Sequence, residues 1–147
     1  MCLSFQDTHA LAALHLTEAP APPDYPQHIM YYYAYKAVND SQRTAKLETL
    51  VTPVQEAVVH TGKNTAEGNI GVSEGDISGG VLHLCVTEQE ARKWSSIWVK
   101  VVVCVYDIVV FSDPIKQLAV SEYYLSQEEY DRAFARLKER YHDSDKA

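Results

Sequence analysis

The sequence predicts a single α+β domain built on a mostly antiparallel sheet of about five or six strands, with two or three short helices. Three observations lead to this class. Apolar residues alternate with a period of two in several short segments. Other segments begin with a helix-capping pattern, and the 147 residues, 46% of them hydrophobic, suffice for one core.

The expected strands are short runs rich in β-branched and aromatic residues. They are Met30–Val38, Val54–His60, Val81–Val86, Ile97–Phe111 and Leu118–Leu125. The run from Ile97 to Phe111 is so apolar that we expect it in the centre of the sheet, with a turn near Asp107. The tyrosines of the first strand are expected to pack on both faces of the sheet. A stacking platform for bases or sugars is the alternative.

The expected helices are read from their capping and stop signals. The stretch "NDSQRTAKLETLVTP" predicts a short helix that Pro53 ends. Two capping boxes, Thr87 with Glu90 and Ser126 with Glu129, predict two further helix starts. The first of these helices should end near Ser95 or Ser96, and the last should pack one apolar stripe on the sheet.

The first 29 residues differ from the rest of the chain. Four of the six prolines lie between Pro20 and Pro26. Such a segment is extended and supplies few backbone donors to a sheet. We therefore expect a poorly ordered tail over residues 1–29, at most a short helix in "HALAALHL", a domain over 30–142 and a frayed end over 143–147. Met30 could itself be the natural start.

Charge argues against a nucleic-acid partner. The net charge is −7, from 13 basic and 20 acidic residues, and no run of Lys or Arg occurs. An acidic surface that mimics DNA is a weaker alternative, which requires the acids to cluster on one face.

Membrane and metal partners are not expected either. No apolar run reaches about 18 residues, and the first residues lack the pattern of a signal peptide. Cys2, Cys85 and Cys104 cannot all pair and show no metal-ligand spacing. These features predict a cytoplasmic protein without a metal, whose partner is a nucleotide, another small molecule or a protein.

A glycine-rich segment separates two of the expected strands. All six glycines lie between Gly62 and Gly80, mixed with Glu67, Glu74 and Asp76. The acids disfavour a phosphate cradle, which presents backbone N–H groups to an anion. Walker and dinucleotide-binding patterns are also missing. We therefore expect a flexible lid or surface loop near a binding cleft.

The order of segments between residues 57 and 125 carries a resemblance. A strand ends in "VVHTG", a later strand leads into "VTEQEARKW", which fits x-T-x-x-x-A-x-x-W/Y, and Glu122 follows late in the domain. This order resembles small ADP-ribosyltransferase-like domains. The resemblance implies an ADP-ribosyltransferase-like fold that binds NAD or a related nucleotide and, if active, transfers ADP-ribose to a macromolecule.

The resemblance also implies roles for single residues. His60 would bind NAD and assist catalysis, Thr61 and Gly62 would shape the turn beneath the nicotinamide, and Glu122 would be the catalytic carboxylate that stabilises an oxocarbenium-like centre. His83 or Cys85 would stand where the family usually has a tyrosine or serine. The sequence departs from the family at Val120, where a second Glu or Gln is common.

Three alternatives stay open. Another alignment takes "YYYAYKAV" as the first strand of the site, with Tyr35 and Lys36 beside the cofactor. His83 is either a core histidine or one that faces a groove. The alternative function is a non-catalytic interaction or inhibitor module on a similar fold, in which His60, His83 and Glu122 do not converge and an exposed tyrosine or apolar patch dominates.

Overall fold

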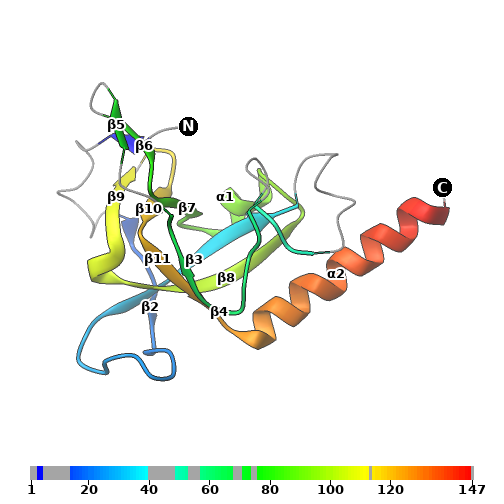
Figure 1. Ribbon diagram of the computed structural model, residues 1–147, viewed down its shortest axis with the longest axis horizontal. Helices are drawn as coiled ribbons and strands as arrows, with labels where there is room; N and C mark the ends of the chain where they lie inside the picture. Colours follow the sequence, from blue (N-terminus) through cyan, green and yellow to red (C-terminus); the bar gives the residue numbers. More distant parts are fainter. Residues whose placement is uncertain are drawn as a thin grey trace.

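The chain forms an α+β structure whose strand pairs are all antiparallel in the part described (Figure 1). The computed structural model describes residues 3–4, 14–39, 49–52, 57–67, 71–73, 76–112 and 114–146. The expected class and the antiparallel pairing are therefore confirmed. The main sheet has eight strands, more than the five or six predicted.

The main sheet runs in the order β4-β11-β8-β3-β7-β10-β9, with β2 paired to β3. Its strands are β2 (Glu18–Ala19), β3 (Tyr31–Val38), β4 (Gly62–Thr65), β7 (Leu82–Cys85), β8 (Ile97–Cys104), β9 (Ile108–Ser112), β10 (Gln117–Val120) and β11 (Glu122–Leu125). A small second sheet has the order β1-β6-β5. Its strands are β1 (Leu3–Ser4), β5 (Gly71–Ser73) and β6 (Asp76–Gly79).

A long bent hairpin explains part of the extra strand count. The expected strand Ile97–Phe111 is split into β8 and β9 by a 3-10 turn at Val105–Asp107, and Leu118–Leu125 is split at Ser121. The Ser121 amide donates to the Asp107 carbonyl at 2.8 Å, so the two bends face each other. One half of the hairpin pairs with β3 and the other with β7, and β8 lies inside the sheet as expected while β9 ends it.

Two α-helices accompany the sheet, α1 (Glu88–Arg92) and α2 (Gln127–Lys146). Both predicted N-caps are present: the Thr87 hydroxyl accepts from the Glu90 amide and the Ser126 hydroxyl from the Glu129 amide, each at 3.2 Å. The Glu90 carboxylate accepts from Lys93, and the Glu129 carboxylate accepts from the Lys100 amide. The first helix ends at Arg92, earlier than predicted. The reason is the buried Ser95, whose hydroxyl donates to the Val38 carbonyl at 2.6 Å and draws the chain onto β3.

One main core lies between the curled sheet and α2. Alternate residues of β8 enter it because side chains of a strand point to opposite faces. Ala133 and Leu137 of α2 lie in the same cluster. Figure 1 shows α2 extending away from the sheet beyond this contact. Among the described residues, the largest fully buried side chains of the protein are Leu50, Leu84, Leu118, Leu125, Leu137, Val38, Val59, Val99, Val101 and Val103.

The segment before β4 differs from the prediction of a strand over Val54–His60. In its described part, residues 57–60, only an isolated bridge joins Val58 to Val51, and the strand begins at Gly62. The Asn64 side chain bonds both backbone polar groups of His60 and turns the chain there. The predicted helix ending at Pro53 lies largely outside the described residues.

Two further segments are more ordered than predicted. Residues 14–29, expected in a tail outside the domain, pack against it: Leu14 is 4% exposed in the main core and β2 pairs with β3. The described parts of the glycine-rich segment, expected to be a flexible lid or loop, form the short strands β4, β5 and β6.

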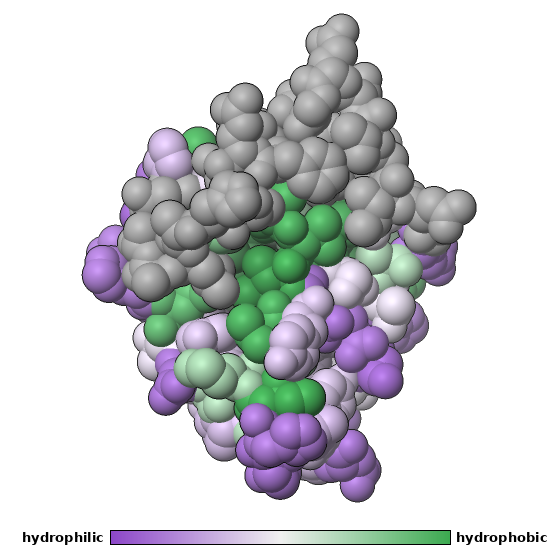
Figure 2. Space-filling view, turned by 90° about the vertical axis from the view of Figure 1, so that its left-hand side faces the viewer, coloured by the Kyte–Doolittle hydropathy of each residue, from purple (hydrophilic) through white to green (hydrophobic). Residues whose placement is uncertain are grey.

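The side of the molecule that carries β9 has an apolar band between polar margins (Figure 2). A second small cluster lies in this part of the fold, in which Val81, Val109 and Ile115 pack on buried Val110 and Ala119. Across the described residues, we find no helix with the length and apolar character needed to cross a membrane.

Candidate functional site

The six residues singled out from the sequence fall into three places. His60, Thr61 and Gly62 lie at the entry to β4, Tyr35 and His83 lie on β3 and β7, and Glu122 begins β11.

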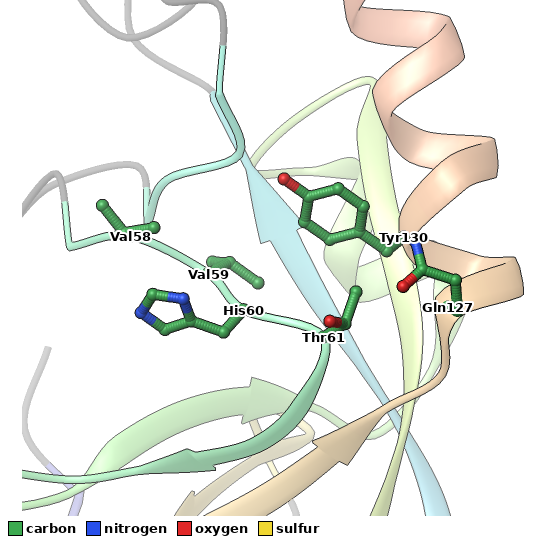
Figure 3. A pocket seen from close by; sticks show the side chains of 6 residues that line it. All are labelled: Val58, Val59, His60, Thr61, Gln127 and Tyr130. Atoms are coloured by element: carbon green, nitrogen blue, oxygen red, sulfur yellow. The ribbon is translucent and has the colours of Figure 1, made fainter.

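An open pocket of about 360 Å³ lies between the segment before β4 and the first turns of α2 (Figure 3). Val58, Val59, His60 and Thr61 come from the segment, and Gln127 and Tyr130 come from α2. Two of the predicted residues, His60 and Thr61, thus line the same pocket.

The backbone of the pocket segment is fixed from both sides. The buried Val59 anchors it, and the Val59 amide donates to the Leu50 carbonyl at 3.0 Å. The Asn64 carboxamide accepts from the His60 amide at 2.9 Å and donates to the His60 carbonyl at 2.7 Å. Gly62 has φ +81°, a left-handed backbone conformation that residues other than glycine rarely adopt. The exposed His60 side chain therefore stands on a well-determined backbone.

The α2 wall of the pocket is set by the helix start. The cap at Ser126 fixes the first turn, and the Tyr130 amide donates to the Ser126 carbonyl at 3.0 Å. The Tyr130 ring stacks on Phe134, with centroids 6.0 Å apart and planes 16° apart. Gln127 donates its amide to Asp131 at 2.8 Å. A half-buried aromatic ring and an exposed amide thus face the segment that carries His60.

The chemistry of this pocket favours binding over catalysis. None of its six lining residues is Asp, Glu, Lys or Arg. An imidazole, two hydroxyls and an amide can exchange hydrogen bonds with a polar ligand, and the Tyr130 ring can stack on a planar one. General acid–base catalysis by His60 would need a partner group within hydrogen-bond reach, and the lining residues supply no carboxylate for that task.

Glu122 is engaged in a cluster of its own. Its carboxylate accepts from the Tyr25 hydroxyl at 3.2 Å and from the Thr65 hydroxyl at 3.5 Å, and Lys63 approaches it at 3.9 Å. Nearby, Ser121 donates to the Asp107 carboxylate at 3.2 Å. Partial burial, and then the charge of Glu122, raise the pKa of Asp107.

The strand register separates Glu122 from the pocket. Glu122 pairs with Thr65, and Gly62 pairs with Leu125 at the other end of β4. Three residues of a strand span about 10 Å. His60 precedes Gly62 by two residues and so lies on the side of Gly62 away from Thr65 in the sequence. The structure does not bring Glu122 and His60 together.

His83 lies elsewhere again. The strands β8 and β3 stand between β11 and β7, so Glu122 and His83 lie on strands three steps apart in the sheet. His83 pairs with Ala119 of β10, which precedes Glu122 by three residues across the bend at Ser121. Tyr35 pairs with Cys85 and is therefore a diagonal neighbour of His83.

The β3–β7 contact is held by a buried ammonium group. The Lys36 Nζ donates to the His83 carbonyl at 2.7 Å, and burial lowers the pKa of Lys36 to about 8. Burial, followed by the charge of Lys36, also lowers the pKa of His83. Burial raises the pKa of the Cys85 thiol to about 11, so this cysteine is a poor nucleophile. Within the described part of the chain, no group of three or more His, Cys, Asp or Glu residues could hold a metal ion.

Reasoning from the sequence missed the residues that complete these places. Gln127 and Tyr130 were placed on the predicted last helix, but nothing in a single sequence says which loop that helix faces. Tyr25 was placed in a tail, although it bonds Glu122. Its only sequence signal was an aromatic residue between prolines, which is uncommon in a tail that stays in solvent.

Comparisons with known proteins add no family. No protein-family model, curated protein or solved structure matches the chain.

Proposed function

We propose that the protein is a binding module that holds a nucleotide, with NAD as the first candidate, in the pocket between His60 and Tyr130. One observation supports this most: two of the residues that the ADP-ribosyltransferase resemblance assigns to the ligand, His60 and Thr61, line an open pocket with an aromatic ring on its opposite wall. Aromatic rings and neutral hydrogen-bonding groups suit the base or the nicotinamide of such a ligand.

The proposed module binds without transferring ADP-ribose. A transferase of the kind that the resemblance implies needs a carboxylate beside the developing cation. Glu122 pairs with Thr65 at the far end of β4. Its carboxylate accepts hydrogen bonds from the Tyr25 and Thr65 hydroxyls and forms an ion pair with Lys63. The non-converging residues support the non-catalytic alternative, with a ligand pocket retained.

The direct test is a titration with NAD in which calorimetry or ligand-detected NMR measures the affinity. Base–aromatic stacking contributes about 1–3 kcal/mol, so Tyr130→Leu should weaken binding about tenfold. His60→Ala should weaken it severalfold through the loss of one hydrogen bond. Glu122→Gln is the matched control, because the register places it outside the pocket, and it should leave the affinity unchanged.

Either of two results would contradict the proposal. One is no saturable binding to the wild type at millimolar NAD. The other is a loss of affinity in Glu122→Gln as large as that in His60→Ala. Release of nicotinamide that depends on Glu122 would instead establish the transferase.

A further inference from the structure

Tyr25 occupies a niche formed by four other residues, which are Tyr31, Lys63, Glu122 and Tyr124. Its ring meets Tyr31 and Tyr124 edge to face, with centroids 6.0 and 5.8 Å apart. Edge-to-face contacts of this kind favour aromatic rings over aliphatic side chains. The walls of the niche come from β3 and β11, and both belong to the rigid sheet.

The polar side of the niche is specific for a phenol. The Tyr25 hydroxyl donates to the Glu122 carboxylate at 3.2 Å. The Lys63 ammonium lies 5.7 Å from the centre of the Tyr25 ring and 3.9 Å from the same carboxylate. A phenol thus meets a charged acceptor at its hydroxyl and a cation beside its ring, whereas a phenylalanine side chain would leave the carboxylate without this donor.

The occupant belongs to a loop that is largely exposed. Tyr25 lies in the connection between β2 and β3, residues 20–30, and most residues of this connection face solvent. It is tied down by a turn, in which the Tyr25 amide donates to the Pro22 carbonyl at 3.1 Å, and by the Tyr31 hydroxyl, which donates to the Pro26 carbonyl at 2.9 Å. Exposed loops with few buried contacts open at the lowest free-energy cost.

We propose that this niche is a recognition site for a tyrosine side chain of a partner protein, presented in a proline-containing segment, and that Tyr25 fills it in the absence of that partner. The seated loop shows the chemistry that fits: a tyrosine followed by proline, with the proline carbonyl accepting from Tyr31. The proposal does not depend on the pocket at His60.

The surroundings of the niche favour a protein over a polyanion. Two carboxylates, Glu122 and Asp107, act on Tyr25 and raise its pKa, after burial, to about 12. They would repel phosphates. The turn that carries Asp107 also exposes Tyr106 (81%), and its Val105 amide is bonded to the carbonyl of Met30, itself 47% exposed. Exposed large apolar side chains around an aromatic niche are typical of protein interfaces.

The test empties the niche in the full-length chain with Tyr25→Ala. The probes are p-cresol, which copies the tyrosine side chain, and toluene, which lacks the hydroxyl. NMR signals of Tyr31, Tyr124 and Tyr130 report where each probe binds. We expect p-cresol to bind Tyr25→Ala saturably, at least tenfold more tightly than the wild type, and to shift Tyr31 and Tyr124 but not Tyr130.

Two further comparisons test the specificity of the niche. Toluene should bind Tyr25→Ala at least fivefold more weakly than p-cresol, and adding Glu122→Ala should abolish that difference. A synthetic peptide that copies residues 18–30 should bind Tyr25→Ala, and the same peptide with phenylalanine in place of tyrosine should bind severalfold more weakly.

The proposal is overturned if folded Tyr25→Ala binds p-cresol no better than the wild type, or if the probe shifts Tyr130 and leaves Tyr124 unchanged. If Tyr25→Ala does not fold, Tyr25→Ser carries the same comparison, since the small serine side chain also vacates the space between Tyr31 and Tyr124. Equal binding of p-cresol and toluene to that variant would also overturn it.

Discussion

Lys36 shows how strongly one side chain in this fold depends on its surroundings. It lies on β3 opposite Val99, which belongs to the main core, and its ammonium donates to the His83 carbonyl at 2.7 Å. Burial lowers its pKa from 10.5 to about 8. The unfolded chain therefore binds this proton more tightly, and the lysine contributes more stability as the pH rises from about 8 toward 10.5.

We predict that Lys36→Met raises the free energy of unfolding at pH 7 by about 1–2 kcal/mol. A pKa shift of this size corresponds to roughly 3 kcal/mol, and the lost hydrogen bond to His83 offsets about 1–2 kcal/mol of it. Urea denaturation at pH 7 and pH 10 measures the effect, and the difference from the wild type should shrink at pH 10. The exposed Lys93→Met is the control and should change stability by less than about 0.5 kcal/mol.

Two of the six residues that line the pocket were predicted from the sequence. His60 and Thr61 were identified because they stand together in a short motif. Gln127 and Tyr130 were not, because the contact between α2 and the His60 segment depends on the bend of the hairpin that precedes α2. Glu122 was identified as unusual on an apolar strand, and its role in the structure is to bond Tyr25, Thr65 and Lys63.

Among the elements, those with local signals were predicted best. Both predicted N-caps form, and β7 and β8 fall within one residue of the expected strand starts. Elements that depend on long-range pairing were predicted worst. The break at Ser121 has no strong sequence signal, because the strand bends only where its amide meets the Asp107 carbonyl across the hairpin. The pairing of β2 with β3 likewise depends on where β7 leaves the β3 edge.

The start of α2 couples the helix to the pocket. Ser126→Ala removes the cap that accepts from the Glu129 amide, which should cost about 1 kcal/mol of stability. Because Gln127 and Tyr130 lie in the first turns of α2, the same change should also weaken NAD binding. Thermal unfolding and the NAD titration together check this. Thr87→Ala, which removes the cap of α1, is the control and should lower stability but leave NAD affinity unchanged.

Across the whole molecule, the main difference from expectation is the extent of the domain. Four prolines within a short stretch indicated a tail, because proline cannot donate to a sheet. The structure uses them in a connection between β2 and β3, and the residues before β2 contribute Leu14 to the main core. The composition of the proline-rich segment shows only that it would not form a sheet alone. In the structure, its Tyr25 packs on Tyr31 of β3 and on Tyr124 and Glu122 of β11.

Leu14→Ala tests whether this segment is part of the folding unit. Removing a buried leucine side chain costs about 2–5 kcal/mol. We expect a loss in that range by urea denaturation, with a single cooperative transition. A change below about 0.5 kcal/mol would show that residues 14–30 do not contribute to the core. Leu16→Ala, at a position only partly buried against that core, should cost less.

An NMR titration of the isotope-labelled chain with NAD tests whether a nucleotide binds beside His60 and Tyr130, away from Glu122. We expect saturable shifts at His60, Thr61, Gln127 and Tyr130, with His83 and Glu122 unchanged. Shifts centred on Tyr35, His83 and Glu122, or no shifts at millimolar NAD, would contradict this expectation.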